Sequence, residues 1–394
     1  MAPAVDPNMI RPPPRSLAPA PPGLLPPPPD KALTKPLTVL CTVGVSAECE
    51  ERLRDAFGTF HYYAEGEEIP ADILPSIDVM FNTWTGPPGV VSDFAQTPRL
   101  KHVQLCSSGA DKAMASAPFQ KLVRDGGKVA GVERNVTLAN ASGTHVLTIP
   151  NWVVGMLVNV YHQVPRQIMI ARNEQRWALR PEIDAGGGQY YARVTHGRMA
   201  GMLGYGQLGR ESARLLKAMG MRIVAANTSG KATPQDGYVI PGTGDADGSI
   251  PEAYYSTKDA AQTREFLSRC DVLVASLPNT PQTAGWLDEE KLGHLPPNAV
   301  FLNVGRGSLV KSEHLLAALD RPSGLFGAAI DVTDPEPLPD GHPLYTHPRV
   351  IVTPHLSGDT EGEMDIAADV FLRNCARVAE GKEVINRVHF ERGY

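Results

Sequence analysis

A glycine-rich turn in the middle of the chain places the strongest constraint on its fold. Residues 199–203 form a short apolar run that predicts a buried strand, and residues 204–209, Gly-Tyr-Gly-Gln-Leu-Gly, follow it directly. Apolar residues then recur at helical spacing through residues 210–219. The first glycine permits a tight turn, the second allows the backbone to approach a ligand, and the third lets helix and strand pack closely. The segment therefore predicts a strand, a turn and a helix in immediate succession.

This arrangement also predicts a site for the pyrophosphate of a dinucleotide. A helix that begins at about Gln207 directs its positive end and its free N–H groups toward an anion. A glycine-rich turn without a ligand is the alternative, because such spacing is common in proteins. The residues expected to contact the cofactor at this turn are Gly204, Gly206, Gln207, Leu208 and Gly209.

The residue that would hold the adenosine ribose lies about twenty positions further on, at the end of the next expected strand. Here it is Asn227, and the segment that follows contains Thr228 and Lys231. An aspartate would accept hydrogen bonds from both ribose hydroxyls and repel a 2′-phosphate, whereas this segment has donors, one cation and no acid. We therefore expect NADP(H) in preference to NAD(H), with Asn227, Thr228 and Lys231 as contacts. Binding of NAD(H) through a neutral ribose contact is the alternative.

After residue 36 the chain alternates between short β-branched runs and helical stretches, which is typical of α/β architecture. We expect an α/β fold with two Rossmann-like or flavodoxin-like parallel-sheet domains and a cleft between them. Residues 145–354 are expected to form the dinucleotide-binding domain, and residues 36–144 plus 355–394 the substrate-binding, catalytic domain. A long apolar helix is expected over residues 145–161. The expected strands cover residues 37–43, 79–83, 100–105, 128–132, 199–203, 222–226, 272–276, 299–303, 327–331 and 350–352.

The first 35 residues are rich in proline, with runs at residues 12–14 and 26–29. Such a composition predicts a disordered or polyproline tail without a packed core. The alternative is a functional segment, since residues 12–15 could dock in an aromatic groove of the SH3 kind.

Charge and cysteine content argue against several classes of partner. With a formal net charge of -6 and a pI near 6.0, the chain has no broad attraction for nucleic acid or anionic lipid. Its five cysteines are scattered and form no C-x-x-C pair, which is typical of a reducing compartment. We expect a cytoplasmic protein with no nucleic-acid or membrane partner. No metal site is expected either, because the spacing of His342 and His347 matches no common ligand pattern.

Several further motifs occur in a fixed order along the chain. Together they resemble the D-isomer-specific 2-hydroxyacid dehydrogenase family, and within it most the glyoxylate/hydroxypyruvate reductase group. The resemblance covers nearly the whole chain after the proline-rich tail. It implies reversible NAD(P)H-dependent reduction of a 2-keto acid to a D-2-hydroxy acid, and a homodimer. The motifs are residues 204–209, residues 276–283 (Ser-Leu-Pro-Asn-Thr-Pro-Gln-Thr), residues 303–307 (Asn-Val-Gly-Arg-Gly), residues 331–338 (Asp-Val-Thr-Asp-Pro-Glu-Pro-Leu) and residues 353–355 (Thr-Pro-His).

Three residues in these motifs suit the chemistry of hydride transfer. Reduction places negative charge on the carbonyl oxygen, so His355 is expected to donate the proton. The resemblance assigns to Glu336 the carboxylate that orients this imidazole and favours its protonated form. Arg306 can hold the substrate carboxylate and polarise the carbonyl with its planar fork of donors. Taken singly, each could instead be a surface ion pair, a solvated loop charge or a capping histidine.

The resemblance also implies roles for residues outside this set. Ser108 and Gly109 would offer backbone N–H groups to the substrate carboxylate, and Asp331 would contact the nicotinamide amide. Ordinary turn and strand-end roles are the alternative. The remaining residues expected to line the cofactor site are Pro278, Thr283, Val304 and Gly358.

The sequence departs from the family pattern in two places. A glutamate is usual in the helix before the dinucleotide domain, where this chain reads Ile-Pro-Asn-Trp at residues 149–152. The loop over residues 231–256 is longer than the usual link, and it lies near the adenosine end.

Two other functions share these motifs. A cofactor-sensing binding protein resembling the C-terminal-binding corepressors would also keep Arg306, Glu336 and His355. Formate dehydrogenase is a further alternative within the fold. Glu336 counts against it, because that relative has a neutral glutamine beside its histidine.

Overall fold

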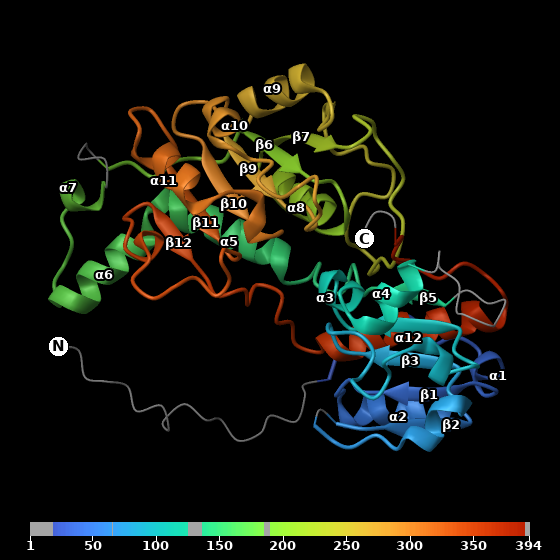
Figure 1. Cartoon of the computed structure of the whole chain (residues 1–394). Coiled ribbons are helices and arrows are strands. Elements are labelled where there is room, and N and C mark those ends of the chain that lie inside the picture. The colour runs from blue at the N-terminus through green and yellow to red at the C-terminus, as the bar shows by residue number, and fades with distance from the viewer. Residues whose placement is uncertain (1–18, 65, 125–135, 185–189, 391–394) are drawn as a thin grey trace. The chain divides into compact units, whose positions relative to one another are not determined.

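The chain forms two compact units, each built around a parallel β-sheet (Figure 1). The structure, a computed structural model, describes residues 19–64, 66–124, 136–184 and 190–390. Unit 1 comprises Met1–Thr144 and Glu361–Tyr394, and unit 2 comprises His145–Thr360. The second crossing between units therefore falls at residue 360 rather than at residue 354, and His355 belongs to unit 2.

Unit 1 contains a five-stranded sheet in the order β2-β1-β3-β4-β5 among its described residues. All pairings between these strands are parallel. Its strands are β1 (Thr38–Cys41), β2 (Thr59–Tyr62), β3 (Val79–Asn82), β4 (His102–Leu105) and β5 (Thr137–Ala139), and its helices are α1 (Lys31–Thr34), α2 (Ala47–Ala56), η2 (Ala71–Ser76), η3 (Phe94–Gln96), α3 (Asp111–Met114), α4 (Ala117–Arg124) and α12 (Glu363–Ala379).

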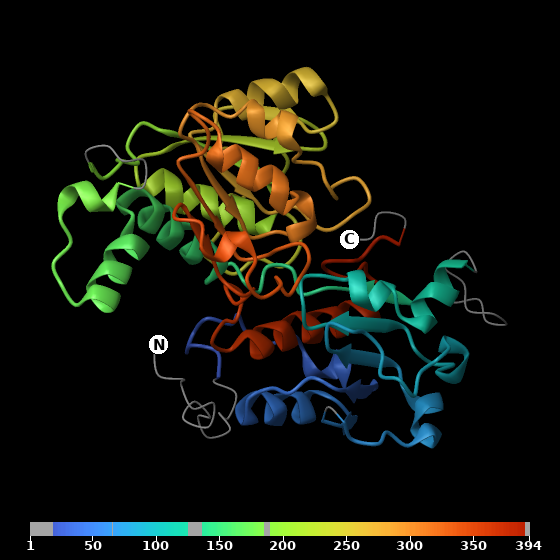
Figure 2. The ribbon, with the colours of Figure 1, turned by 60° about the vertical axis from the view of Figure 1, so that its left-hand side comes forward.

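Apolar layers cover both faces of this sheet. Successive side chains of a strand point to opposite faces. Val39 and Cys41 accordingly pack with residues of α2 and α12, whereas Leu40 packs with Phe94 and Phe119 on the other side. Figure 2 shows α12 lying along the sheet, so the last long helix of the chain completes the unit that the first strands begin.

The expectation of a disordered tail through residue 35 is wrong for its last part. The Asp30 side chain accepts a hydrogen bond from the Ala32 N–H at 2.9 Å and caps α1. Arg373 of α12 donates to the carbonyls of Pro26 and Pro27. Composition alone could not show this, because the segment is ordered by a helix more than 300 residues away in the sequence. Residues 1–18 lie outside the described residues.

Unit 2 contains a seven-stranded parallel sheet in the order β12-β11-β10-β9-β6-β7-β8 within the described chain. The chain runs from β6 outward through β7 and β8, then returns to the other side of β6 at β9. Its strands are β6 (Met199–Leu203), β7 (Arg222–Asn227), β8 (Tyr254–Ser256), β9 (Val272–Ala275), β10 (Val300–Asn303), β11 (Gly327–Ile330) and β12 (Val350–Val352), and its helices are α5 (Ile149–His162), α6 (Val164–Glu174), α7 (Arg180–Ile183), α8 (Gln207–Ala218), α9 (Ala260–Ser268), α10 (Glu289–Gly293), η4 (Gly307–Leu309), α11 (Ser312–Asp320) and η5 (Pro343–Tyr345).

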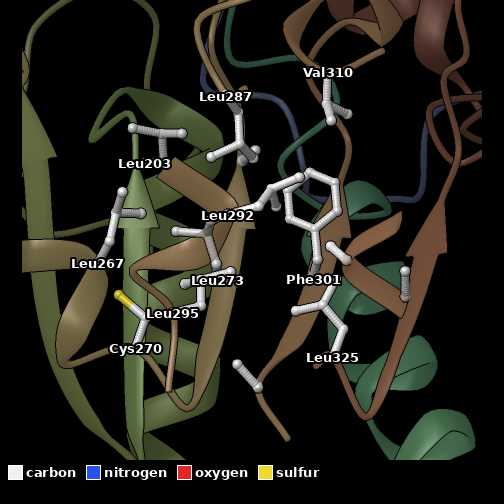
Figure 3. Close-up of a cluster of buried hydrophobic side chains, with 14 of the residues drawn as sticks. Leu203, Leu267, Cys270, Leu273, Leu287, Leu292, Leu295, Phe301, Val310 and Leu325 are labelled. Carbon is white, nitrogen blue, oxygen red and sulfur yellow. The ribbon is translucent and has the colours of Figure 1, made fainter. Parts of the chain in front are cut away.

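Helices lie on both faces of this second sheet. Figure 3 shows the apolar layer on one face, where Leu203, Leu273 and Phe301 of the strands meet the leucines of α9 and α10. On the opposite face, α5 and α8 pack against β6 and its neighbours. The fold class expected from the sequence, two parallel α/β sheets, is confirmed.

The strand predictions hold for the interior of both sheets and for the edge strand β12. The expected runs at residues 199–203 and 350–352 coincide with β6 and β12. The edge strands β2, β5 and β8 have no expected counterpart. The run expected at residues 128–132 and the triple glycine at residues 186–188 lie outside the described residues.

One part of unit 2 stands away from its sheet. Helix α6 has no buried residue and, with α7, projects from the rest of the unit (Figure 1). Large apolar side chains are exposed along this α6–α7 arm. They are Ile168, Met169, Trp177 and Leu179. Within the described residues, no helix is long and apolar enough to span a membrane.

Candidate active site

The residues expected to bind the cofactor and to catalyse in unit 2 follow the carboxyl ends of its parallel strands. The last residues of these strands stand in register, with Leu203 beside Ala275 and Asn303 beside Ile330. Because the strands are parallel, the segments that follow them share one edge of the sheet. The glycine turn follows β6, Asn227 ends β7, Arg306 follows β10, Asp331 follows β11 and His355 follows β12.

The glycine turn has the geometry that a pyrophosphate requires. Gly204 has a φ of 95°, a left-handed conformation that favours glycine. A Cβ atom at Gly209 would lie 2.2 Å from the carbonyl oxygen of Gly204, so only glycine lets α8 pack this close to β6. A Cβ at Gly206 would have nothing within 4 Å, which leaves open space in front of the first turn of α8. The turn therefore fits a dinucleotide phosphate group.

At the adenosine end, Asn227 shapes its own loop. Its Oδ1 accepts hydrogen bonds from the N–H groups of Ser229 and Gly230, at 3.1 and 2.7 Å, and its Nδ2 donates to the Lys231 carbonyl at 2.9 Å. The Ser229 hydroxyl also donates to Oδ1 at 3.0 Å, so the role expected for the Asn227 side chain as a ribose contact competes with four bonds inside the turn. A carboxylate is absent from this turn, and the Lys231 ammonium supplies a positive charge beside the strand end.

Glu336 and His355 form a direct pair. The Nδ1 atom of His355 lies 2.7 Å from Oε1 of Glu336, and nearly half of each side chain is exposed. The other Glu336 oxygen accepts from the Thr333 N–H at 3.4 Å. With Nδ1 bound to the carboxylate, Nε2 is the nitrogen left to serve a substrate. The pair has the form of a carboxylate-oriented general acid.

Asp331 fixes the loop that carries His355. It is buried, and its carboxylate accepts hydrogen bonds from the N–H groups of Leu356 and Ser357 at 3.2 and 3.1 Å. The hydroxyls of Thr353 and Ser357 also donate to it. His355, between these anchors, has a φ of 56°, which a side-chain-bearing residue adopts only when its surroundings enforce it. A role for Asp331 at the nicotinamide stays a prediction.

Arg306 sits on a turn that Asn303 organises. The Asn303 side chain is fully buried, accepts from the Gly305 N–H at 3.1 Å and donates to the Arg306 carbonyl at 3.1 Å. A Cβ at Gly305 would lie 2.7 Å from the Leu277 carbonyl oxygen, so this turn presses against the segment after β9. Asn303 opens one of the family-like motifs, but nothing in the sequence signals this role of its side chain.

His145 is a second residue that the sequence analysis missed. Its Nδ1 lies 3.1 Å from the carbonyl oxygen of Gly358, three residues after His355. Burial lowers the pKa of His145, and the charges of His355 and Arg306 lower it further. No periodic or motif signal marks His145 in the sequence, because its partner lies 213 positions away.

The other expected contacts have structural roles of their own. The Thr283 hydroxyl donates to the Pro278 carbonyl at 2.7 Å, and Val304 is buried with its N–H bonded to the Ala275 carbonyl. In unit 1, Ser108 and Gly109 lie just past β4, and the Ser108 hydroxyl donates to the Ala141 carbonyl at 3.3 Å. Their contacts with cofactor and substrate stay predictions.

A cavity of about 290 Å³ in unit 2 lies apart from this edge. It is lined by Asn159, Phe326 and Arg349 among others, at the amino ends of β11 and β12. Among the residues that the structure describes, no cluster of three or more histidines, cysteines or acids could hold a metal.

Comparison with known proteins identifies the family model that fits the second unit. Residues 154–357 match the model described as D-isomer specific 2-hydroxyacid dehydrogenase, NAD binding domain. The match covers more than half of the chain and contains the glycine turn, Arg306, Glu336 and His355.

Three individual proteins show the range of similarity. An uncharacterised protein of Corynebacterium melassecola is 29% identical over 330 residues, or 84% of this chain and 93% of that protein. A glyoxylate/hydroxypyruvate reductase A of Salmonella paratyphi B is 36% identical over 57% of this chain, and the match spans 62% of that reductase. A D-isomer specific 2-hydroxyacid dehydrogenase from Xanthobacter autotrophicus Py2, solved with NADPH and MES, shares the fold, with a TM-score of 0.67, 24% identity and coverage of 91% of this chain and 99% of that one.

Proposed function

Because this chain belongs to the D-isomer specific 2-hydroxyacid dehydrogenase family, a family of oxidoreductases, we propose that it reduces a small 2-keto acid to the D-2-hydroxy acid. The observation that carries the proposal is the 2.7 Å pair of His355 and Glu336 at the same sheet edge as the glycine turn. A histidine placed there has a carboxylate partner at Nδ1, which leaves Nε2 for a substrate.

The chain's own residues supply the binding and the proton. A dinucleotide held at the glycine turn would supply the hydride that reduces the keto carbon, and negative charge would develop on the carbonyl oxygen. His355 Nε2 donates its proton to that oxygen, which yields the alcohol and a neutral imidazole that is reprotonated from solvent. Glu336 holds the imidazole at Nδ1 throughout. Arg306 binds the substrate carboxylate and steadies the negative charge that develops on the carbonyl oxygen.

The substrate class is part of the proposal. Glyoxylate and hydroxypyruvate are the first candidates, since the Salmonella reductase is 36% identical over its matched part. That part spans 62% of the reductase, so the likeness supports the chemistry more strongly than the choice of keto acid.

We further propose that NADP(H) is preferred over NAD(H). The β7 end bears Asn227 where an aspartate would repel a 2′-phosphate, and Thr228 and Lys231 follow with a hydroxyl and an ammonium group. The internal bonds of Asn227 hold this turn in one conformation, so the donors of Thr228 and Lys231 are the stronger candidates for the phosphate.

A homodimer and a cytoplasmic location complete the proposal. The apolar α6–α7 arm is the surface best suited to a second copy, because Met169 and Trp177 are 60% and 90% exposed. The five cysteines are free and buried, which supports a reducing compartment.

A substrate panel tests the activity. Purified protein is mixed with glyoxylate, hydroxypyruvate or phenylpyruvate, and the oxidation of NADPH and of NADH is followed in parallel. We expect turnover with at least one keto acid and a kcat/KM at least tenfold higher with NADPH, equivalent to about 1.4 kcal/mol. Tenfold preference for NADH would contradict the cofactor assignment. Tight cofactor binding without turnover would contradict the enzyme and favour the cofactor-sensing alternative.

A further inference from the structure

The long loop between β7 and β8 is bonded to both sides of the glycine turn. The Tyr205 hydroxyl donates to Oδ2 of Asp245 at 2.7 Å. The Asp245 N–H donates to Oε1 of Gln235 at 2.9 Å, and the Gln235 amide in turn donates to the side-chain oxygen of Gln207. Since Tyr205 and Gln207 flank Gly206, these bonds close a ring through the loop and back to the turn.

The Tyr205 and Asp245 side of the ring is buried, and charged groups bond to the loop there. Tyr205 and Asp245 are each 6% exposed and Arg210 is 3% exposed. The Arg210 guanidinium donates to the carbonyls of Asp245 and Thr233, at 2.6 and 2.9 Å, and lies 5.0 Å from the centre of the Tyr205 ring. Glu211, also buried, accepts from the Gly244 N–H at 2.7 Å.

The Asp245 carboxylate also accepts hydrogen bonds from backbone N–H groups of its own loop. Its oxygens accept from the N–H groups of Ser249 and Ile250, both at 3.0 Å, as well as from Tyr205. Burial acts to raise the pKa of Asp245, but the bonds from Ile250, Tyr205 and Ser249 outweigh it and lower the pKa overall. The carboxylate is thus charged where it meets the tyrosine, and charge-assisted bonds of this kind are the stronger ones.

We propose that Tyr205 and Asp245 are positioning residues that hold the glycine turn open for the cofactor's pyrophosphate. A backbone turn that binds phosphate through its N–H groups gains affinity when it is fixed in the bound conformation beforehand. The loop therefore sets cofactor affinity without touching the reacting atoms. This inference rests on the proposed function only in that it requires a dinucleotide at this turn.

Direct cofactor binding tests the inference independently of turnover. The dissociation constant of NADPH is measured by its fluorescence or by calorimetry for the full chain and for Tyr205→Phe and Asp245→Asn. We expect each variant to bind NADPH about tenfold more weakly, with an increased KM for NADPH and an unchanged kcat at saturation. Because the two variants share the Tyr205–Asp245 hydrogen bond, the double variant should lose less affinity than the sum of the two single losses.

Tyr255→Phe is the matched control. Its hydroxyl donates to Oε1 of Glu265 at 3.1 Å, and its side chain packs in the apolar layer on the face of the sheet opposite to that of Tyr205. Its NADPH affinity should stay within about twofold of the parent protein, while the melting temperatures report any general loosening.

The outcomes separate the two proposals. Unchanged NADPH affinity in folded Tyr205→Phe and Asp245→Asn overturns the inference and leaves the reductase standing. Equal weakening in Tyr255→Phe also overturns it, because the loss would then arise from stability alone. A parent protein that binds no dinucleotide overturns both. Normal cofactor binding with the expected losses, but without keto-acid turnover, supports the inference and contradicts the reductase.

Discussion

At the scale of single residues, the chemistry depends on one imidazole and the carboxylate that holds it. Glu336 is 2.7 Å from His355, and the loop on either side of His355 is bonded to the buried Asp331. The backbone of His355 has a positive φ, a conformation that persists only when the surrounding contacts hold it. The anchors of this loop are therefore as much a part of the site as the histidine.

Glu336→Gln removes the charge of the side chain but keeps its size and its hydrogen-bond acceptor. The amide oxygen can still accept from His355 Nδ1, but the carboxylate charge beside the imidazole is gone. We expect keto-acid reduction to slow by roughly 10- to 100-fold. The measurement is kcat across pH 5.5 to 8.5. Glu313→Gln, at an exposed position in α11, is the control, and equal rates for both variants at every pH would refute the role of Glu336.

His102 gives a stability prediction in unit 1. Burial lowers its pKa from 6.5 to about 4, so the unfolded chain takes up a proton at a higher pH than the folded one. The free energy of unfolding should therefore fall as the pH drops from 6.5 toward 4, by up to about 3 kcal/mol from this group. Above pH 6.5 the group contributes no pH dependence.

His102→Asn tests that assignment. The amide nitrogen can take over the 2.9 Å bond of Nδ1 to the Thr137 hydroxyl without titrating. Thermal or denaturant unfolding measured between pH 4 and pH 7 should show a shallower pH dependence for the variant. Parallel curves for variant and parent would mean that His102 is not the group responsible.

At the scale of elements, the glycines of the β6–α8 turn divide into structural and functional positions. Gly209→Ala places a methyl group 2.2 Å from the Gly204 carbonyl, so we expect a loss of about 1–3 kcal/mol in stability. Gly206→Ala meets nothing within 4 Å and should fold normally, yet weaken NADPH binding at least about tenfold by filling the pyrophosphate's space.

The two variants control one another. Melting temperature and NADPH affinity are measured for both. We expect the melting temperature to fall mainly in Gly209→Ala and the NADPH affinity to fall mainly in Gly206→Ala. A Gly206→Ala protein that binds NADPH as tightly as the parent would show that the cofactor does not approach this glycine.

How well a strand could be predicted from the sequence depends on how deeply it is buried in its sheet. Interior strands such as β6 and β10 are buried on both faces, and their apolar runs are visible in the sequence. Edge strands such as β2 and β8 pair with one neighbour only and are partly exposed, so their composition carries a weak signal. The boundary of α8 was predictable because the glycines that precede it are a strand-to-helix turn in themselves.

The site could be predicted only where a motif spans adjacent residues. Gly204 and Arg306 stand in short fixed patterns, whereas the ring through Gln235 and Asp245 joins residues 28 to 40 positions apart with no periodicity. His145 likewise depends on a bond across 213 positions. Contacts of this kind arise from packing of the finished fold.

At the scale of the whole molecule, the exposed apolar side chains of the α6–α7 arm predict that two copies of the chain associate through it. Met169→Glu combined with Trp177→Glu places charges on its apolar side chains, and a homodimer that uses this arm should dissociate. Light scattering at micromolar concentration measures the mass. Val123→Glu, at a 40% exposed apolar position of α4 in unit 1, should leave the dimer intact. A monomeric parent protein, or a double variant that stays dimeric, would contradict the arm's role.

Isotope transfer tests the central claim most directly. The protein is incubated with a 2-keto acid and NADPH deuterated at C4, and the product is analysed by chiral chromatography and mass spectrometry. The account predicts a D-2-hydroxy acid with one deuterium at C2, formed by the parent protein and at least about a hundredfold more slowly by His355→Gln. An L-product, a product without deuterium, or undiminished turnover in His355→Gln would contradict it.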